Sequence, residues 1–233
     1  MNETVTPTSR TIRCAAIILY QPLRKHDWLP MALDLAFRLP AANPGWDIQV
    51  LTVDGTQEPL PGDRKFSRHA RARNAAIETF VTAPNAEPYD YVLWLDSDLV
   101  QYDADFPSRA HAANPGGITA PTILVDKMPG RFYDTAGFVD LSGQWSRHET
   151  PWLNGRPQPG ADGSPIVELA SVGCMYLAPA SVYRGGARYA HGEGFTEHLP
   201  FCTAARSRGV RVCCLPRSTA HHAYLPDYGE RWH

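Results

Sequence analysis

The chain has 233 residues, which is long enough for one large domain with a substantial core. Hydrophobic residues make up 43% and charged residues 20%, a composition typical of an ordinary soluble globular protein. The formal net charge of −2 excludes a global basic field that would attract nucleic acid or an anionic membrane, so any phosphate must be bound by a local arrangement of side chains.

The N-terminus has neither the apolar segment nor the small-residue cleavage site of a signal peptide, and no apolar run reaches the length of a membrane span. The spacing of the cysteines is not that of a metal site, so we interpret them as reduced thiols in or near the core. They are Cys14, Cys174, Cys202, Cys213 and Cys214. These features predict a cytoplasmic protein without a membrane span, whose residues 1–10 form a flexible tail and whose residues 11–233 form one domain.

Helices and strands alternate in the first half of the chain. The pattern predicts strands at Thr11–Tyr20, Trp46–Thr56 and within Tyr89–Asp103, and helices at Trp28–Leu39 and Phe66–Val81. Such βαβαβ alternation predicts a Rossmann-type α/β domain, with a mostly parallel sheet and helices on both faces.

The carboxyl ends of the three strands carry polar residues. Tyr20 ends the first strand, Asp54 lies at the end of the second, and Asp96 and Asp98 follow the buried run of the third. Ligands of parallel sheets bind at the carboxyl ends of the strands, so we expect these side chains to line one crevice.

The second half is less regular. It predicts strands at Gly116–Asp126, Val167–Ala178 and Val210–Pro216, and a helix at Pro200–Arg208. Residues 126–165 are rich in Gly, Pro and aromatic residues, and a loop of this length is typically a lid, a binding loop or disordered. Its aromatic side chains either stack on a sugar or anchor the loop to the core; they include Phe132, Tyr133, Trp145 and Trp152.

Two carboxylates one residue apart at the end of a core strand can approach the same divalent cation. Mg²⁺ and Mn²⁺ prefer oxygen ligands and often share a site with substrate phosphates. A buried carboxylate is costly unless it is paired or metal-bound, which favours a cation here. The alternative is that Asp96 caps the following turn and Asp98 is solvated.

Three stretches carry a resemblance to a known family. "YVLWLDSDLV" resembles the Asp-x-Asp strand of GT-A glycosyltransferases, which use nucleotide-sugar donors. "LTVDGT" resembles the V-D-D-G-S strand of the family-2-type enzymes, with Asp54 at the acid that contacts the nucleotide base. "ARARNAAI" resembles their A-R-N-x-G-I helix, with Arg73 and Asn74 at the matched positions. "RARN…VLWLDSD" also has some likeness to fungal Golgi mannosyltransferases that extend mannan.

The C-terminal stretch "TEHLPFCTAARSRGVRVCCLPRSTAHH" resembles the family pattern of an acidic pair, a cysteine, a glycine, a proline and a late metal-binding histidine. Glu197 occupies the first acidic position and His222 the histidine position. The second acid of the family is His198 here, which leaves the geometry around Glu197 open. His221 adjoins His222, and the sequence does not decide which of the two faces the metal.

The resemblance implies a GT-A-like fold, with a nucleotide-sugar-binding half at 11–103 and an acceptor-side half at 104–233. It implies a Mn²⁺- or Mg²⁺-dependent transfer of a sugar from a UDP- or GDP-linked donor to a hydroxyl of a small-molecule or glycan acceptor. Glu197 would act as the general base. The implied metal ligands are Asp96, Asp98 and His222, and the implied donor-binding residues are Tyr20, Asp54, Arg73, Asn74 and Asp96.

Two other functions remain open from the residues. The same nucleotide-binding sheet serves nucleotidyltransferases, although "YQPLRKHD" after the first strand has basic residues and no glycine for a triphosphate loop. A non-catalytic module that binds a nucleotide sugar or a glycan would need neither Glu197 nor a complete metal site.

Overall fold

The computed structural model describes residues 10–20, 29–58, 60–63, 66–149, 152, 155–190 and 196–224. The predicted flexible tail therefore lies outside the described residues except for Arg10, whose guanidinium pairs with Asp90 at 2.8 Å. Trp28, predicted to begin the first helix, also lies outside them.

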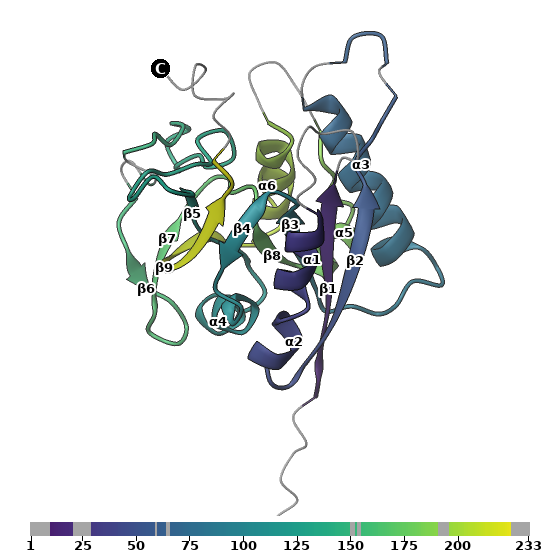
Figure 1. Ribbon diagram of the computed structural model, residues 1–233, viewed down its shortest axis with the longest axis horizontal. Helices are drawn as coiled ribbons and strands as arrows, with labels where there is room; N and C mark the ends of the chain where they lie inside the picture. Colours follow the sequence, from purple (N-terminus) through teal and green to yellow (C-terminus); the bar gives the residue numbers. More distant parts are fainter. Residues whose placement is uncertain are drawn as a thin grey trace, which may run out of the picture.

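A nine-stranded mixed sheet forms the centre of the described part of the chain, in the order β2-β1-β3-β8-β5-β9-β7-β6, with β4 paired to β9 (Figure 1). The strands are β1 (Ile12–Tyr20), β2 (Trp46–Asp54), β3 (Tyr91–Asp96), β4 (Leu99–Tyr102), β5 (Ile118–Val125), β6 (Gln158–Pro159), β7 (Pro165–Glu168), β8 (Tyr176–Pro179) and β9 (Val212–His222). The helices are α1 (Leu29–Ala36), α2 (Leu39–Ala42), α3 (Ser67–Ile77), the π-helix η1 (Glu78–Thr82), α4 (Phe106–Ala113), α5 (Ala180–Arg184) and α6 (His198–Arg206).

Most of the strands point in one direction. β1 pairs in parallel with both β2 and β3. β8 is antiparallel to both β3 and β5, so β5, and β9 beside it, again run in the direction of β1. α1, α2 and α4 lie in front of the sheet and α5 and α6 lie behind it (Figure 1). The predicted α/β domain with a mostly parallel sheet and helices on both faces is thus confirmed.

Of the two helices predicted in the first half, the first is divided in two and the second has nearly its predicted extent. The pattern predicts one helix at Trp28–Leu39, but α1 ends at Ala36, and a separate helix, α2, has Pro40 in its first turn. A proline is tolerated there because the first N–H groups of a helix have no partner within it. The helix predicted at Phe66–Val81 is present as α3 and continues into the π-turn of η1.

The apolar run around the acidic pair is two strands instead of one. β3 ends at Asp96, and after the turn at Ser97–Asp98 β4 pairs with β9 in antiparallel orientation. The prediction missed this break because apolar residues stand on both sides of the turn. The turn places Asp96 and Asp98 between two strands that have different neighbours.

The second half differs most from the predictions. The single strand predicted at Val167–Ala178 is wrong: β7 pairs with β9, whereas β8 lies between β3 and β5. The last strand is longer than predicted, with an irregular register near Pro216. α6 begins at His198, before Pro200, and α5 was not predicted.

The five cysteines are free and buried, as predicted. Phe132 and Phe138 are fully buried and pack edge to face with ring centroids 4.9 Å apart. Phe132 therefore anchors its segment to the core, which excludes it as a sugar-stacking ring. None of the helices among the described residues combines the length and the apolar composition needed to cross a bilayer.

Asn43 joins three elements from a fully buried position. Its amide nitrogen donates to the carbonyls of Leu39 (2.7 Å) and Ala104 (2.8 Å), and its oxygen accepts from the backbone N–H of Ser108 (3.0 Å). Replacing it leaves buried polar groups without partners.

We predict that Asn43→Ala lowers the free energy of unfolding by roughly 1–3 kcal/mol, measured by urea denaturation. Asn85→Ala, at an exposed position, is the control and should have little effect. Equal stability of the two variants would contradict the role of Asn43.

Candidate functional site

The carboxyl ends of β1, β2 and β3 lie side by side. Tyr20 pairs with Asp54, and Leu19 pairs with Asp96. Gly55 N–H donates to the Tyr20 carbonyl at 2.6 Å, and a Cβ on Gly55 would lie only 3.0 Å from that oxygen. The close approach of the two strand ends therefore favours glycine at position 55.

The Asp54 side chain is exposed and takes part in its own turn. Its Oδ1 accepts the backbone N–H of Thr56 at 2.8 Å. Hydrogen bonds from Thr56 hold the pKa of Asp54 below its ordinary value, so the side chain is ionised at neutral pH. One carboxylate oxygen is thus used by the turn, and a contact with a nucleotide base stays a prediction.

Asp98 and His222 are brought together by the pairing of β4 with β9. Leu99 lies opposite His222, and the Ala223 N–H donates to the Asp98 carbonyl at 2.8 Å. The Asp98 Oδ1 and His222 Nε2 atoms are 3.0 Å apart, and both side chains are buried. Tyr133 stacks on the imidazole with ring centroids 3.5 Å apart and planes at 11°.

This pair needs a positive charge. The Nδ1 atom of His222 lies 3.0 Å from the Ala223 carbonyl, which only accepts, so Nδ1 carries a proton. Nε2 faces a carboxylate, which also only accepts when ionised. Burial alone lowers the pKa of His222, but Asp98 outweighs this and raises it. A second proton on the imidazole would let Nε2 donate to Asp98 Oδ1. A cation bound between Nε2 and Oδ1 would serve both atoms as well.

The donor atoms of Asp98 and His222 suit a divalent cation. Two ligand atoms in adjacent positions around an octahedral ion lie about 3 Å apart, as Oδ1 and Nε2 do. Among the described residues, however, no group of three or more His, Cys, Asp or Glu side chains is arranged to hold a metal. His221 follows the alternation of β9 onto the opposite face from His222.

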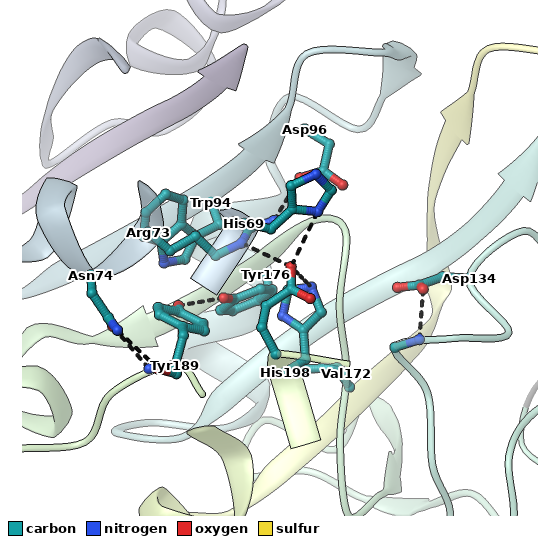
Figure 2. Close-up of polar contacts among 12 residues, drawn as sticks. His69, Arg73, Asn74, Trp94, Asp96, Asp134, Val172, Tyr176, Tyr189 and His198 are labelled. Carbon is teal, nitrogen blue, oxygen red and sulfur yellow. Dashed lines mark hydrogen bonds and ion pairs between the residues drawn. The ribbon is translucent and has the colours of Figure 1, made fainter. Parts of the chain in front are cut away.

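A buried arginine joins the remaining acids. Arg73, on α3, is 2% exposed, and its Nη2 atom lies 2.8 Å from Asp96 Oδ1 while its Nε atom lies 3.5 Å from Glu197 Oε1 (Figure 2). The guanidinium carbon lies 4.8 Å from the centre of the Trp94 ring and 5.8 Å from that of Tyr189. Arg73 therefore links the end of β3 to the start of α6.

Glu197 precedes α6 and is 2% exposed. Its Oε1 also lies 3.8 Å from His69 Nδ1 and 3.5 Å from His198 Nε2, whereas Oε2 is buried without a hydrogen-bond partner among the described residues. Burial raises the pKa of Glu197, and Arg73 opposes this. Burial also holds the pKa of His198 well below its ordinary value, so this ring is neutral.

The Asn74 side chain makes two hydrogen bonds to the backbone of Tyr189. Its amide nitrogen donates to the Tyr189 carbonyl at 2.8 Å, and its oxygen accepts the Tyr189 N–H at 2.9 Å. The Tyr189 hydroxyl contacts those of Tyr176 and Tyr183. Asn74 thereby fixes a ring that packs against Arg73, and a direct contact of Asn74 with a nucleotide stays a prediction.

Sequence reasoning missed four residues near these acids: His69, Tyr133 as the ring on His222, Asp134 and Cys174. Cys174 has a positive φ of 57° beside Gly173. Burial, together with the nearby Asp96 and Asp134 carboxylates, raises the pKa of the Cys174 thiol well above its ordinary value. The only signal for any of them was that Tyr133 and Asp134 lie in the loop rich in Gly and aromatic residues.

No protein-family model matches the chain, and no curated protein sequence is significantly similar to it. Solved structures are similar in fold. GalNAc-T7 with UDP, GalNAc and Mn²⁺ has a TM-score of 0.55 at 13% identity, with 93% of this chain and 44% of that chain covered. TarS of S. aureus has a TM-score of 0.54 at 12% identity, with 94% and 38% covered.

A Drosophila β-1,4-galactosyltransferase 7 mutant, in complex with manganese, UDP-Gal and xylobiose, has a TM-score of 0.52 at 14% identity, with 94% of this chain and 73% of that chain covered. The chain thus spans less than half the length of GalNAc-T7 and TarS. At these identities the likeness shows the fold, which is GT-A-like, as predicted. A likeness to fungal mannosyltransferases does not appear among these structures.

We predict that Arg73→Met lowers the free energy of unfolding by about 3–5 kcal/mol, because it leaves Glu197 buried without its positive partner. The control is Arg71→Met, two residues earlier on α3, whose ion pair with Asp63 is partly exposed and whose loss should cost much less. Chemical denaturation of both variants measures the difference. Similar losses would show that Arg73 does not hold the buried acids.

Proposed function

We propose that the chain is a metal-dependent glycosyltransferase. It moves a sugar from a nucleoside diphosphate donor, linked to UDP or GDP, to a hydroxyl group of a small-molecule or glycan acceptor. The observation that carries the proposal is the Asp98–His222 pair, with donor atoms 3.0 Å apart, at the carboxyl end of a GT-A-like sheet. Nucleotides bind α/β sheets at this end.

In this proposal Asp98 and His222 hold a Mn²⁺ or Mg²⁺ ion, which neutralises negative charge on the departing diphosphate. The tautomer of His222 suits this role, since the Ala223 carbonyl keeps the proton on Nδ1 and leaves Nε2 as the ligand atom. Tyr133 holds the plane of the imidazole by stacking.

Asp96 is proposed to face the donor. Arg73 occupies its Oδ1, and the side chain remains 29% exposed, so Oδ2 can reach a ribose hydroxyl or a water on the metal. Tyr20 and Asp54 line the neighbouring strand ends, where we propose that they contact the nucleoside. Arg73 and Asn74 support this side from within the fold, because their polar atoms are directed to Asp96, Glu197 and the Tyr189 backbone.

Glu197 is proposed as the general base. Its Oε2 has no hydrogen-bond partner in the part of the chain that the structure describes, and it can accept the proton of the acceptor hydroxyl. As that proton leaves, the hydroxyl oxygen bonds to the anomeric carbon of the donor sugar and the bond from that carbon to the diphosphate breaks. Arg73 favours the ionised form of Glu197 before the transfer. His198 is neutral and therefore adds no positive charge beside Glu197.

A thermal-shift panel of UDP, GDP, CDP, dTDP and CTP, each with Mn²⁺ or EDTA, tests donor binding, since selective binding raises the melting temperature. Hydrolysis of the corresponding nucleotide sugars then tests turnover. Metal-dependent stabilisation by one diphosphate with hydrolysis of its sugars supports the proposal. Stabilisation by CTP with release of pyrophosphate would instead show a nucleotidyltransferase, and binding without turnover a non-catalytic module.

We predict that Asp98→Asn and His222→Ala each abolish the gain in nucleoside diphosphate affinity that Mn²⁺ provides, because each removes one ligand atom. Isothermal titration of the diphosphate selected above, with Mn²⁺ and with EDTA, measures this gain. His221→Ala is the matched control, since its side chain lies on the other face of β9. If Mn²⁺ still increases the diphosphate affinity of Asp98→Asn, the proposed metal site is wrong.

We predict that Glu197→Gln lowers the rate of sugar transfer by ~10²–10⁴-fold, the usual contribution of a positioned base, and leaves diphosphate affinity nearly unchanged. Initial rates and calorimetry on the same preparation measure both. Glu87→Gln, whose side chain is 55% exposed, is the control. A lowered melting temperature with unchanged turnover would remove Glu197 from the mechanism.

A further inference from the structure

Asp134 is a buried acid that the proposed transfer does not use. It lies after β5 and is 8% exposed. Its Oδ1 accepts the backbone N–H of Gly137 at 2.8 Å, but its Oδ2 is buried without a hydrogen-bond partner among the described residues. A buried carboxyl oxygen without a donor is costly, so it is seldom kept without a use.

Two glycines hold this carboxylate in place. A Cβ on Gly137 would lie 2.4 Å from Oδ2, and a Cβ on Gly173 would lie 2.6 Å from it. Backbone from two separate segments thus packs directly against the carboxylate, and side chains at either position would displace it. The hydrogen bond from Gly137 to Oδ1 also holds the carboxylate in this orientation.

On the far side of Gly173 lies His198. The same Cβ point on Gly173 lies 2.9 Å from His198 Cδ2, so the Asp134 carboxylate and the His198 ring are neighbours, and Figure 2 shows the carboxylate facing that ring. Burial raises the pKa of Asp134 to about 7, with the nearby Asp96 and Glu197 carboxylates acting in the same direction. Glu197, whose Oε2 also has no hydrogen-bond partner among the described residues, directly precedes His198 in the chain.

The ion pairs of the nearby cations go to other groups. Arg73 pairs with Asp96 and Glu197, although its Nη1 atom is buried without a hydrogen-bond partner among the described residues, and His222 directs its two nitrogens to Asp98 and Ala223. None of these contacts gives Asp134 Oδ2 a donor, and a bound ligand can supply one. A diphosphate is unsuitable, since its charge would repel the carboxylate, whereas a hydroxyl group supplies the donor without a charge.

We propose that Asp134 binds the acceptor substrate, and that its Oδ2 accepts a hydrogen bond from a hydroxyl group of the sugar or other polyhydroxylated molecule that receives the transferred sugar. The proposal rests on the proposed function and adds the residue that orients the acceptor beside Glu197. The acceptor then contacts two carboxylate oxygens, Asp134 Oδ2 and Glu197 Oε2, that have no hydrogen-bond partner among the described residues.

The test compares Asp134→Asn and Asp134→Ala with the wild-type protein in two reactions of the same donor. One is hydrolysis of the nucleotide sugar by water, and the other is transfer to a panel of methyl hexopyranosides. Both variants should keep wild-type diphosphate affinity and hydrolysis. We expect kcat/KM for the glycoside to fall about 10-fold in Asp134→Asn, where an amide replaces the carboxyl group, and about 100-fold in Asp134→Ala.

Asp140→Asn is the matched control. Asp140 is a buried acid of the same segment, but its Oδ1 accepts from Ser142 and Gln144 within its own turn, so its variant reports only disturbance of the loop. Melting temperatures at neutral pH complete the comparison. Removal of an unpartnered carboxylate should leave the melting temperature of Asp134→Asn unchanged or higher, whereas a structural acid would lower it.

Wild-type acceptor kinetics in Asp134→Ala, or losses equal to those of Asp140→Asn, would overturn the proposal while the proposed function stands. If Asp134→Ala does not fold, the result for Asp134→Asn decides alone. A wild-type protein that neither binds a diphosphate with metal nor hydrolyses any nucleotide sugar would overturn the proposed function, and this proposal with it.

Discussion

The buried guanidinium of Arg73 is the interaction on which the candidate site depends. An uncompensated charge in the interior is strongly destabilising. A buried arginine is therefore stable only beside acidic groups, and buried ionised acids only beside a cation. Arg73 meets Asp96 at the end of β3 and Glu197 before α6. Three elements distant in the sequence are therefore held together by one charge balance, which also orients the proposed base.

The surroundings of Arg73 are built to keep it in place. The flat guanidinium lies over the Trp94 ring and near Tyr189, which stabilises a cation through the faces of aromatic rings. Asn74 fixes the Tyr189 backbone with two hydrogen bonds, and Trp94 donates from Nε1 to the Tyr183 hydroxyl at 2.9 Å. Residues that resemble donor-binding positions in the sequence thus also serve the architecture behind the donor side.

A second charge pair lies across the sheet end from the first. Asp98 and His222 come from either side of the β4–β9 pairing, and the short turn after β3 separates Asp98 from Asp96. One acid of the Asp-x-Asp sequence therefore belongs to the arginine and the other to the histidine. This division explains why two carboxylates are tolerated at the end of a core strand, since each has its own positively charged or protonated neighbour.

The sequence by itself determined the α/β class, the strands that end at Tyr20, Asp54 and Asp96, the helix that carries Arg73, and the free cysteines. These features depend on the local periodicity of apolar residues, which can be recognised in the sequence before the chain is folded. It also placed Asp98, His222 and Glu197 in one candidate set, through motif order and not through any pattern of burial.

Only the tertiary structure decided which groups meet. The pairing of β4 with β9, rather than any local pattern, selects His222 over His221, because strand alternation turns adjacent residues to opposite faces. The resemblance predicts an acid at position 198, where the chain has histidine; besides Glu197, the acid near that ring is Asp134, from a loop without a motif. Burial and charge compensation between distant segments are properties of the packed chain, and no periodicity along the sequence records them.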